Sequence, residues 1–378
     1  MGVERFHDWW RRASCAERCY GVAALAAAWV EGLLSPDEIR DLETTFSLIL
    51  NDPSPKVRKV LAEALAESRR APATILRALA EDVDDIAVIV AERSPILDDI
   101  DLIDLLSNGN ERLQCAIARR RFVSSRLAAA IIEVAGASAC LELLNNEAAA
   151  VAGVSLQRLA ARFGDVVAIR AALLDRRDLP ASVRHLLIAR TASALAETGL
   201  VRNVLGAKKA DAIAVSACER ATALLSESVP ASEVPALVEH LRLSGALSPA
   251  FLIRAVVRGN VDLFAAALVA LSGRSERRVR AIVVNGRPGA FAALLQDCGL
   301  PAETAPLFRA TIDAWKRAVS SGAVADTVET PFAVAREVQK GFGESGGGSA
   351  GDLSELLRRL SREAADDAVS QRARRIAA

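Results

Sequence analysis

Few side chains of this chain have the types and the spacing that metal binding requires. The three histidines, His7, His185 and His240, lie far apart in the sequence, and none has a partner at the spacing of metal ligands. We therefore expect each imidazole to be packed or solvated. Cys15 and Cys19 would share a helix face, but a metal site needs two more ligands and only His7 lies near them. The sequence thus predicts no metal site and no bound cofactor.

Catalytic sequence motifs are also missing. Residues 206–209 contain two lysines but lack the earlier glycine and the Ser or Thr of a phosphate-binding loop. The sequence holds no nucleophile elbow, no zinc-protease motif and no glycine-rich dinucleotide fingerprint after a strand. Adjacent carboxylates such as Asp84 and Asp85 do not face each other on a helix, so they form no acid–base pair. We predict no catalytic residue and a protein that is not an enzyme.

Two arginine clusters are candidates for anion binding. The smaller cluster, residues 119–121, lies at a helix end, where cations complement the helix dipole. The larger cluster could hold a phosphate or an acidic partner, or it could be an exposed helix balanced by acids elsewhere. The larger cluster, the candidate anion or partner patch, comprises Arg274, Arg277, Arg278, Arg280 and Arg287.

The elements that must position these residues are best defined in residues 51–67. Apolar residues spaced three and four apart form a stripe on one helical face. Ser54 is a suitable N-cap, and Pro55 stands at the first helical position. Asp52, followed six positions later by Arg58, resembles the Asp…Val-Arg core of a HEAT repeat. The resemblance implies that Asp52 and Arg58 bond loop backbone and the adjoining repeat, as structural framework.

The apolar stripe of this helix recurs along the chain. Its first residue, Val57, corresponds to Ile86 and then to Leu113, offsets of 29 and 27 residues. One such unit cannot bury its stripe alone, so neighbouring units must stack on it. The period is shorter than the roughly 40 residues of a standard HEAT unit. The sequence predicts an all-α fold: a HEAT-like helical-repeat solenoid (α-α superhelix) with an irregular C-terminal helical half.

Changes in composition and regularity divide the chain into five parts. The segment 341–351 is the only low-complexity stretch, and its glycines indicate a flexible linker. The predicted parts are an N-terminal helical cap (1–50), HEAT-like repeats (51–200), a C-terminal helical-repeat region (201–340), the Gly-rich linker (341–351) and a tethered amphipathic helix (352–378).

The last part has its own helix signals. Asp352 is a suitable cap, with Glu355 three residues further on. The apolar stripe that follows could dock on the chain's own solenoid or enter the groove of a partner. This candidate partner-binding stripe consists of Leu353, Leu356, Leu357 and Leu360.

Charge and composition restrict the class of protein. Lys plus Arg and Asp plus Glu both number 47, whereas a domain dedicated to nucleic acid or to an anionic membrane is usually basic. The residues are 52% hydrophobic and 4% aromatic, which argues against disorder. The six cysteines are dispersed as expected for reduced thiols, and no N-terminal stretch is long and apolar enough for a membrane span or a signal peptide. We therefore expect a cytoplasmic protein without membrane insertion.

Residues 11–190 also resemble an uncharacterised α-proteobacterial family of HEAT-like repeat proteins. The resemblance implies the fold and carries no activity. It rests on Asp52-Pro53 with Val57-Arg58, Ala71-Pro72, Ser94-Pro95-Ile96-Leu97 with Asp101-Leu102, residues 116–120, Leu143-Leu144-Asn145-Asn146 and Asp178-Leu179-Pro180.

These observations predict a non-enzymatic scaffold or adaptor for protein–protein interaction, with a protein or peptide as partner. One alternative is a nucleic-acid-binding protein, because HEAT-like DNA glycosylases grip a duplex with a similar scaffold. The zero net charge and the placement of Trp9, Trp10, Trp29 and Trp315 mainly near the ends of the array disfavour it. Another alternative is a regulatory protein that is switched by a small ligand held between helices.

Overall fold

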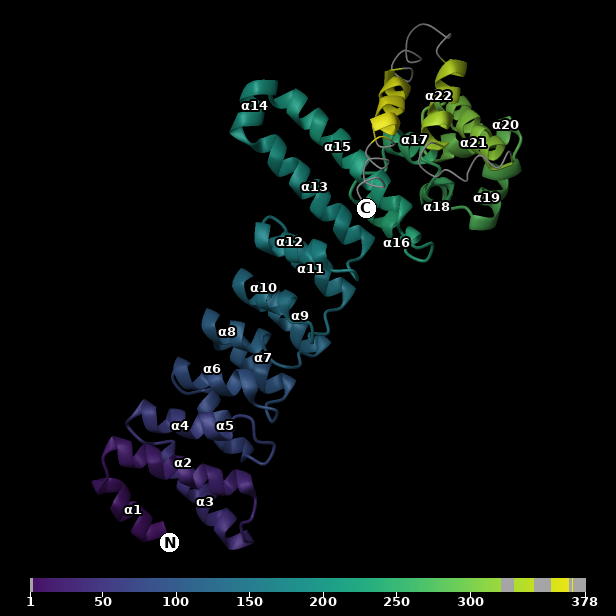
Figure 1. The fold of residues 1–378 in the computed structure, drawn as a ribbon. Coiled ribbons are helices and arrows are strands. Elements are labelled where there is room, and N and C mark those ends of the chain that lie inside the picture. Colours follow the sequence, from purple (N-terminus) through teal and green to yellow (C-terminus); the bar gives the residue numbers. More distant parts are fainter. Residues whose placement is uncertain (1–2, 321–329, 343–354, 367–368, 370–378) are drawn as a thin grey trace. The chain divides into compact units, whose positions relative to one another are not determined.

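The structure is a computed structural model that describes residues 3–320, 330–342, 355–366 and 369 (Figure 1). The regular secondary structure of these residues is helical, apart from an isolated bridge between Val123 and Ala149, and turns and loops connect the helices. The predicted all-α helical-repeat fold is confirmed. The chain forms two compact units, Met1–Leu179 and Pro180–Ala378, which we call the first and the second unit.

The helices of the first unit alternate between two layers. In one layer α2, α4, α6, α8, α10 and α12 follow one another, and α7, α9 and α11 pack in sequence in the other (Figure 1). Val57, Ile86 and Leu113, the repeating positions of the sequence pattern, are all buried. The helices are α1 (Val3–Arg12), α2 (Cys15–Glu31), α3 (Pro36–Ile49), α4 (Pro55–Leu65), α5 (Ala73–Ala80), α6 (Asp84–Arg93), α7 (Asp99–Asn108), α8 (Glu111–Ala118), α9 (Ser125–Val134), α10 (Ala137–Asn145), α11 (Gly153–Phe163) and α12 (Val167–Asp175).

Local sequence signals explain where several of these helices begin. Ser35 caps α3 in a capping box with Glu38, because each residue bonds a backbone N–H that the helix leaves free. Ser54 stands at the N-cap of α4, but its side chain makes no cap bond. Its backbone N–H instead donates to Asp52 Oδ1 at 2.8 Å, so the turn before α4 is fixed by the aspartate.

The second unit begins with a long antiparallel helix pair, α13 and α15, joined by the short α14 (Figure 1). The helices α16, α17, α18, α21 and α22 enclose an aromatic core in which Phe264 and Phe308 stack with ring centroids 4.7 Å apart. Gly259 has a φ of +89°, and a Cβ there would meet the Trp315 ring at 2.8 Å, so only glycine fits this turn. The helices are α13 (Ala181–Glu197), α14 (Gly199–Leu205), α15 (Ala207–Glu227), α16 (Val234–Leu243), α17 (Pro249–Val257), α18 (Val261–Ser272), α19 (Glu276–Asn285), α20 (Pro288–Asp297), α21 (Thr304–Ser320) and α22 (Thr330–Phe342).

One further helix covers residues 355–366, and we call it the terminal helix. Figure 1 draws it in yellow. Leu357 and Leu360 of this helix belong to the same hydrophobic core as α16, α17 and α18. The second unit therefore includes the terminal helix as one of its packed elements.

The boundary between the two compact units falls between Leu179 and Pro180 in the sequence. The domain boundary predicted at residue 200 therefore lies within the second unit, inside α14. The five-part division of the chain stays a prediction. Among the described helices, none combines the length and the apolar character needed to cross a membrane.

Candidate functional site: a buried arginine and its pocket

Asp52 and Arg58, the predicted framework residues, lie at the contact between successive repeats of the first unit. Arg58 donates through Nη1 to the backbone carbonyl of Asp52 at 2.5 Å and forms a two-pronged ion pair with Asp82, with Nε–Oδ2 at 2.6 Å and Nη2–Oδ1 at 2.7 Å. The buried carboxylate of Asp52 pairs with Arg18 at 2.8 Å instead. Each charge thus links one helix pair to the next.

Replacing Arg58 by alanine is expected to lower the free energy of unfolding of the first unit by about 2 kcal/mol, because it leaves Asp82 without its cation. The hydrogen bonds from Arg58 hold the pKa of Asp82 below its usual range. A lowered carboxyl pKa stabilises the folded state above the unfolded pKa of about 4, so this contribution falls as the pH drops through that range. Urea unfolding at pH 7 and pH 3 measures both effects.

Arg112→Ala is the matched control for this experiment. Arg112 pairs with Asp85 at 3.0 Å, but both side chains are largely exposed. We expect a loss below about 1 kcal/mol. Equal losses in the two variants would show that the Arg58 contact is no more than a surface ion pair.

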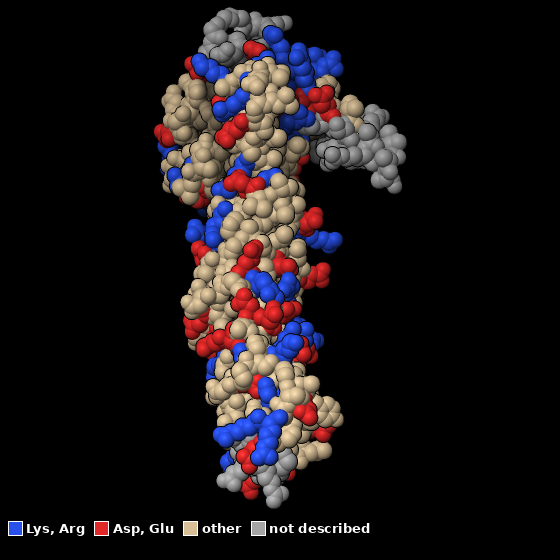
Figure 2. Space-filling model, turned by 90° about the vertical axis from the view of Figure 1, so that its left-hand side faces the viewer, with Lys and Arg blue, Asp and Glu red and all other residues tan. Residues whose placement is uncertain are grey.

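The five arginines of the candidate anion patch are only partly available. Arg274 pairs with Asp297, and Arg280 pairs with both Asp262 and Glu276 at 2.8 Å. The remaining three, Arg277, Arg278 and Arg287, are exposed. Figure 2 shows that acidic and basic side chains are intermixed on one face of the first unit as well. Anion binding by this patch stays a prediction, and these three exposed arginines are the ones that could contact an anion.

The predicted stripe of the last helix faces the protein's own core. Leu357 and Leu360 are buried and Leu356 is half-buried, while Leu353 lies outside the described residues. The arrangement is that of an amphipathic helix in an apolar groove. In this state the terminal helix is bound in cis.

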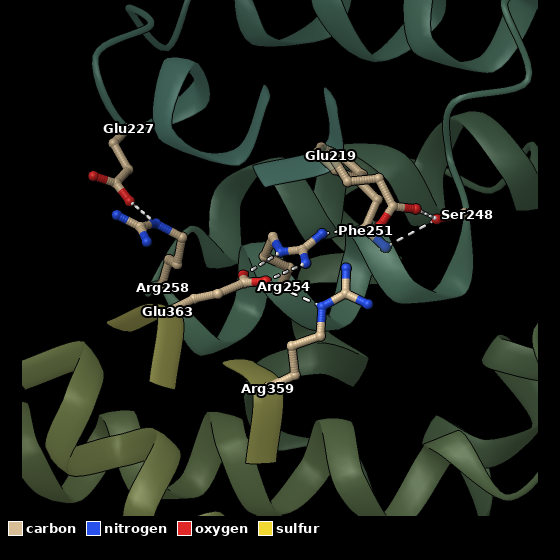
Figure 3. Close-up of polar contacts among 8 residues, drawn as sticks. All are labelled: Glu219, Glu227, Ser248, Phe251, Arg254, Arg258, Arg359 and Glu363. Carbon is tan, nitrogen blue, oxygen red and sulfur yellow. Dashed lines mark hydrogen bonds and ion pairs between the residues drawn. The ribbon is translucent and has the colours of Figure 1, made fainter. Parts of the chain in front are cut away.

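Arg254 is the polar centre of this groove (Figure 3). It lies in α17 within a continuous apolar run, and 2% of its surface is exposed. Its Nη1 donates to Glu219 of α15 at 2.9 Å, while Nε and Nη2 each donate to Glu363 of the terminal helix at 3.2 Å. One buried cation therefore joins three helices.

The two carboxylates around Arg254 are themselves held in place. Ser248, at the N-cap of α17, donates to Glu219, and Arg359 Nε donates to Glu363 at 3.3 Å (Figure 3). Arg254 and Arg359 thus face Glu219 and Glu363, so the network contains two cations and two carboxylates. We call Glu219, Arg254 and Glu363 the clamp. Because a buried charge without its partner is costly, the terminal helix and the arginine depend on each other.

A pair of histidines lies close to the clamp. His185 Nδ1 and His240 Nε2 are 3.1 Å apart, so one ring donates and the other accepts. Burial, and secondarily His240, lowers the pKa of His185 to about 4, and burial lowers the pKa of His240 as well. Both rings are consequently neutral at pH 7. They act as hydrogen-bonding groups and carry no charge there.

A pocket of about 470 Å³ adjoins both features. It runs between α13 and α15 and is lined by His185 and by Glu219 and Ser248 of the clamp network. Among the residues that the structure describes, no cluster of three or more His, Cys, Asp or Glu is arranged to hold a metal ion. The site can hold a helix and a small molecule by packing and hydrogen bonds.

Sequence reasoning missed the clamp and the histidine pair. His185 and His240 are 55 positions apart, and Arg254 and Glu363 are 109 apart, so no local pattern connects them. One signal was available, since Arg254 interrupts an otherwise apolar helical run and charged residues are rarely buried unless paired.

The fold and the site define an all-α helical-repeat protein whose second unit holds an amphipathic helix on a buried arginine. Residues 86–344 match a protein family described as "Uncharacterised protein conserved in bacteria" (DUF2336). Because this match spans more than half of the chain, the protein belongs to that bacterial family. No curated protein and no solved structure matches it significantly.

The prediction that the chain belongs to an uncharacterised bacterial family is therefore confirmed. Its α-proteobacterial origin and its HEAT-like character stay predictions. The family match covers Glu219 and Arg254 and ends before the terminal helix.

Proposed function

We propose that this protein is a non-enzymatic interaction scaffold or adaptor of the cytoplasm, and that the groove around Arg254 is its regulated docking site. The observation that carries the proposal is the docked terminal helix, with Leu357 and Leu360 in the core and Glu363 on Arg254. A groove that accepts an amphipathic helix from its own chain can accept one from a protein or peptide partner.

The chemistry of the groove specifies that partner. An incoming helix must present apolar side chains where Leu357 and Leu360 lie, and a carboxylate one turn further on to satisfy Arg254. The terminal helix would then act as an intramolecular competitor. The HEAT-like stack of the first unit would present further side chains from successive repeats.

Binding of nucleic acid has less support than this proposal. Two of the five arginines of the candidate patch are already neutralised by acids, and Trp29 and Trp315 are engaged through their indole N–H groups with the carbonyls of Arg70 and Val257. A steep loss of affinity for a nucleic-acid duplex with rising salt would nevertheless support nucleic-acid binding.

The proposal predicts that displacing the terminal helix opens the groove. In full-length protein carrying Leu357→Asp and Leu360→Asp, a fluorescent peptide of residues 352–378 should bind at least about tenfold more tightly than in the wild type. The reason is that the tethered helix competes at an effective concentration in the millimolar range. Fluorescence anisotropy measures both affinities, and circular dichroism checks that the variant remains folded.

The matched control is the same peptide with Glu363→Lys, which places a second cation against Arg254 and should bind poorly to both proteins. The proposal fails if the peptide binds the wild type and the variant equally. It also fails if the lysine peptide binds as tightly as the native one. Affinity capture of partners by the wild type and the 1–340 truncation then shows which proteins use the groove.

A further inference from the structure

The pocket between α13 and α15 is elongated. Its lining runs along α13 from His185 to Glu197, twelve positions that correspond to roughly 18 Å of helix. On α15 it runs from Asp211 to Thr222 in the opposite direction. Leu241 and Phe251 line the His185 end, which we call the inner end.

Small side chains keep the pocket open. Ala189, Ala192 and Ala196 of α13 and Ala214 of α15 line its walls, and these side chains are too short to fill the space between two helices. Native interiors are otherwise packed with few voids larger than a water molecule. The volume of about 470 Å³ lies within the range of small-molecule sites.

The charged side chains that line the pocket, among the residues that the structure describes, are of one sign. They are the carboxylates of Glu197, Asp211 and Glu219, with no lysine or arginine among these lining residues. Glu219 is neutralised by Arg254, which leaves Glu197 and Asp211, both exposed, at the outer end. Arg202, whose Nε donates to the carbonyl of Ala196 at 3.4 Å, lies beside this end without lining it, so the two lining carboxylates are the charges that a cation in the pocket would contact.

The inner end is apolar with a few hydrogen-bonding groups. Phe251, Leu241 and Thr222 are buried there, and the half-buried Cys218 lies beside them. An apolar chain that reaches this end would contact side chains that are already shielded from water.

We propose that this pocket binds an elongated, mainly apolar molecule that carries a cationic amine or ammonium group. The apolar part lies along the alanines toward Phe251, and the cation lies between Glu197 and Asp211. This binding activity goes beyond the proposed docking of helices and does not depend on it.

Three probes with one apolar tail test the proposal on the full-length protein: octyltrimethylammonium, octanol and octanoate, each kept below its micelle concentration. Isothermal titration calorimetry should give the affinity order cation, alcohol, carboxylate. The cation should bind at least about tenfold more tightly than octanoate. The double variant Glu197→Gln and Asp211→Asn should bind octanol as the wild type does but lose most of its preference for the cation.

A second measurement locates the bound probe. Octyltrimethylammonium should slow the alkylation of Cys218 by iodoacetamide several-fold, as followed by peptide mass spectrometry, while Cys115 in the first unit reacts at an unchanged rate. Ala192→Phe, which fills the pocket, should abolish both the heat of binding and the protection. The proposal is overturned if octanoate binds as tightly as the cation, if none of the probes binds, or if the cation binds without protecting Cys218. Because none of these outcomes involves the terminal helix, they leave the docking proposal untouched.

Discussion

Replacing Arg254 by alanine is expected to lower the free energy of unfolding of the second unit by about 3–5 kcal/mol. The change removes a guanidinium with 2% exposure that holds carboxylates from two other helices. Glu219 would then lose its cation, and Glu363 would keep only the exposed Arg359. Hydrogen exchange of α17 peptides in increasing urea measures this unit separately from the first.

Two further variants separate the charge from the packing. Arg280→Ala removes a guanidinium that is half exposed, although it also pairs with two acids, and should cost less than about 1 kcal/mol. Arg254→Met combined with Glu219→Gln and Glu363→Gln removes all three charges while keeping the volume, and should recover most of the loss. If Arg254→Ala costs no more than Arg280→Ala, the clamp does not hold the terminal helix.

Acidification is expected to destabilise the second unit through His185. Its pKa lies at about 4 in the folded protein, because burial and then His240 disfavour the imidazolium. An unfolded histidine has a pKa of about 6.5, so between these values the unfolded chain binds more protons than the folded one. The loss of folding free energy caused by His185 is therefore absent above about pH 6.5, grows as the pH falls, and reaches its full size below about pH 4. The full loss is on the order of 3 kcal/mol.

His185→Gln tests this prediction, because glutamine can still hydrogen-bond His240 but does not titrate. Urea unfolding is followed by hydrogen exchange of α13 peptides. Between pH 7 and pH 4 the free energy of unfolding should fall more in the wild type than in the variant. At pH 7.5 the two proteins should differ by less than about 1.5 kcal/mol. Parallel pH curves for both proteins would contradict the buried, neutral state of His185.

The repeat residues illustrate what local patterns could and could not specify. The stripe that begins at Val57 placed α4, and the recurrence at Ile86 and Leu113 placed α6 and α8. The partners in the ion pairs between repeats could not be predicted from local patterns. Arg58 bonds the carboxylate of Asp82, 24 positions away, while the carboxylate of Asp52 bonds Arg18, 34 positions away.

The sequence by itself determined the helical class, many helix starts, the stacking period and the amphipathic character of the last helix. These properties depend on neighbours three or four positions apart and on caps within one turn, so they can be recognised in a linear string. Only the tertiary structure decided that Glu363 meets Arg254, that His185 meets His240, and that alanines on α13 and α15 leave a pocket between them. The physical reason is that helical periodicity specifies which face of a helix is apolar. It does not specify which other helix covers that face, because many pairings bury similar apolar area and only the packing of the whole unit selects one.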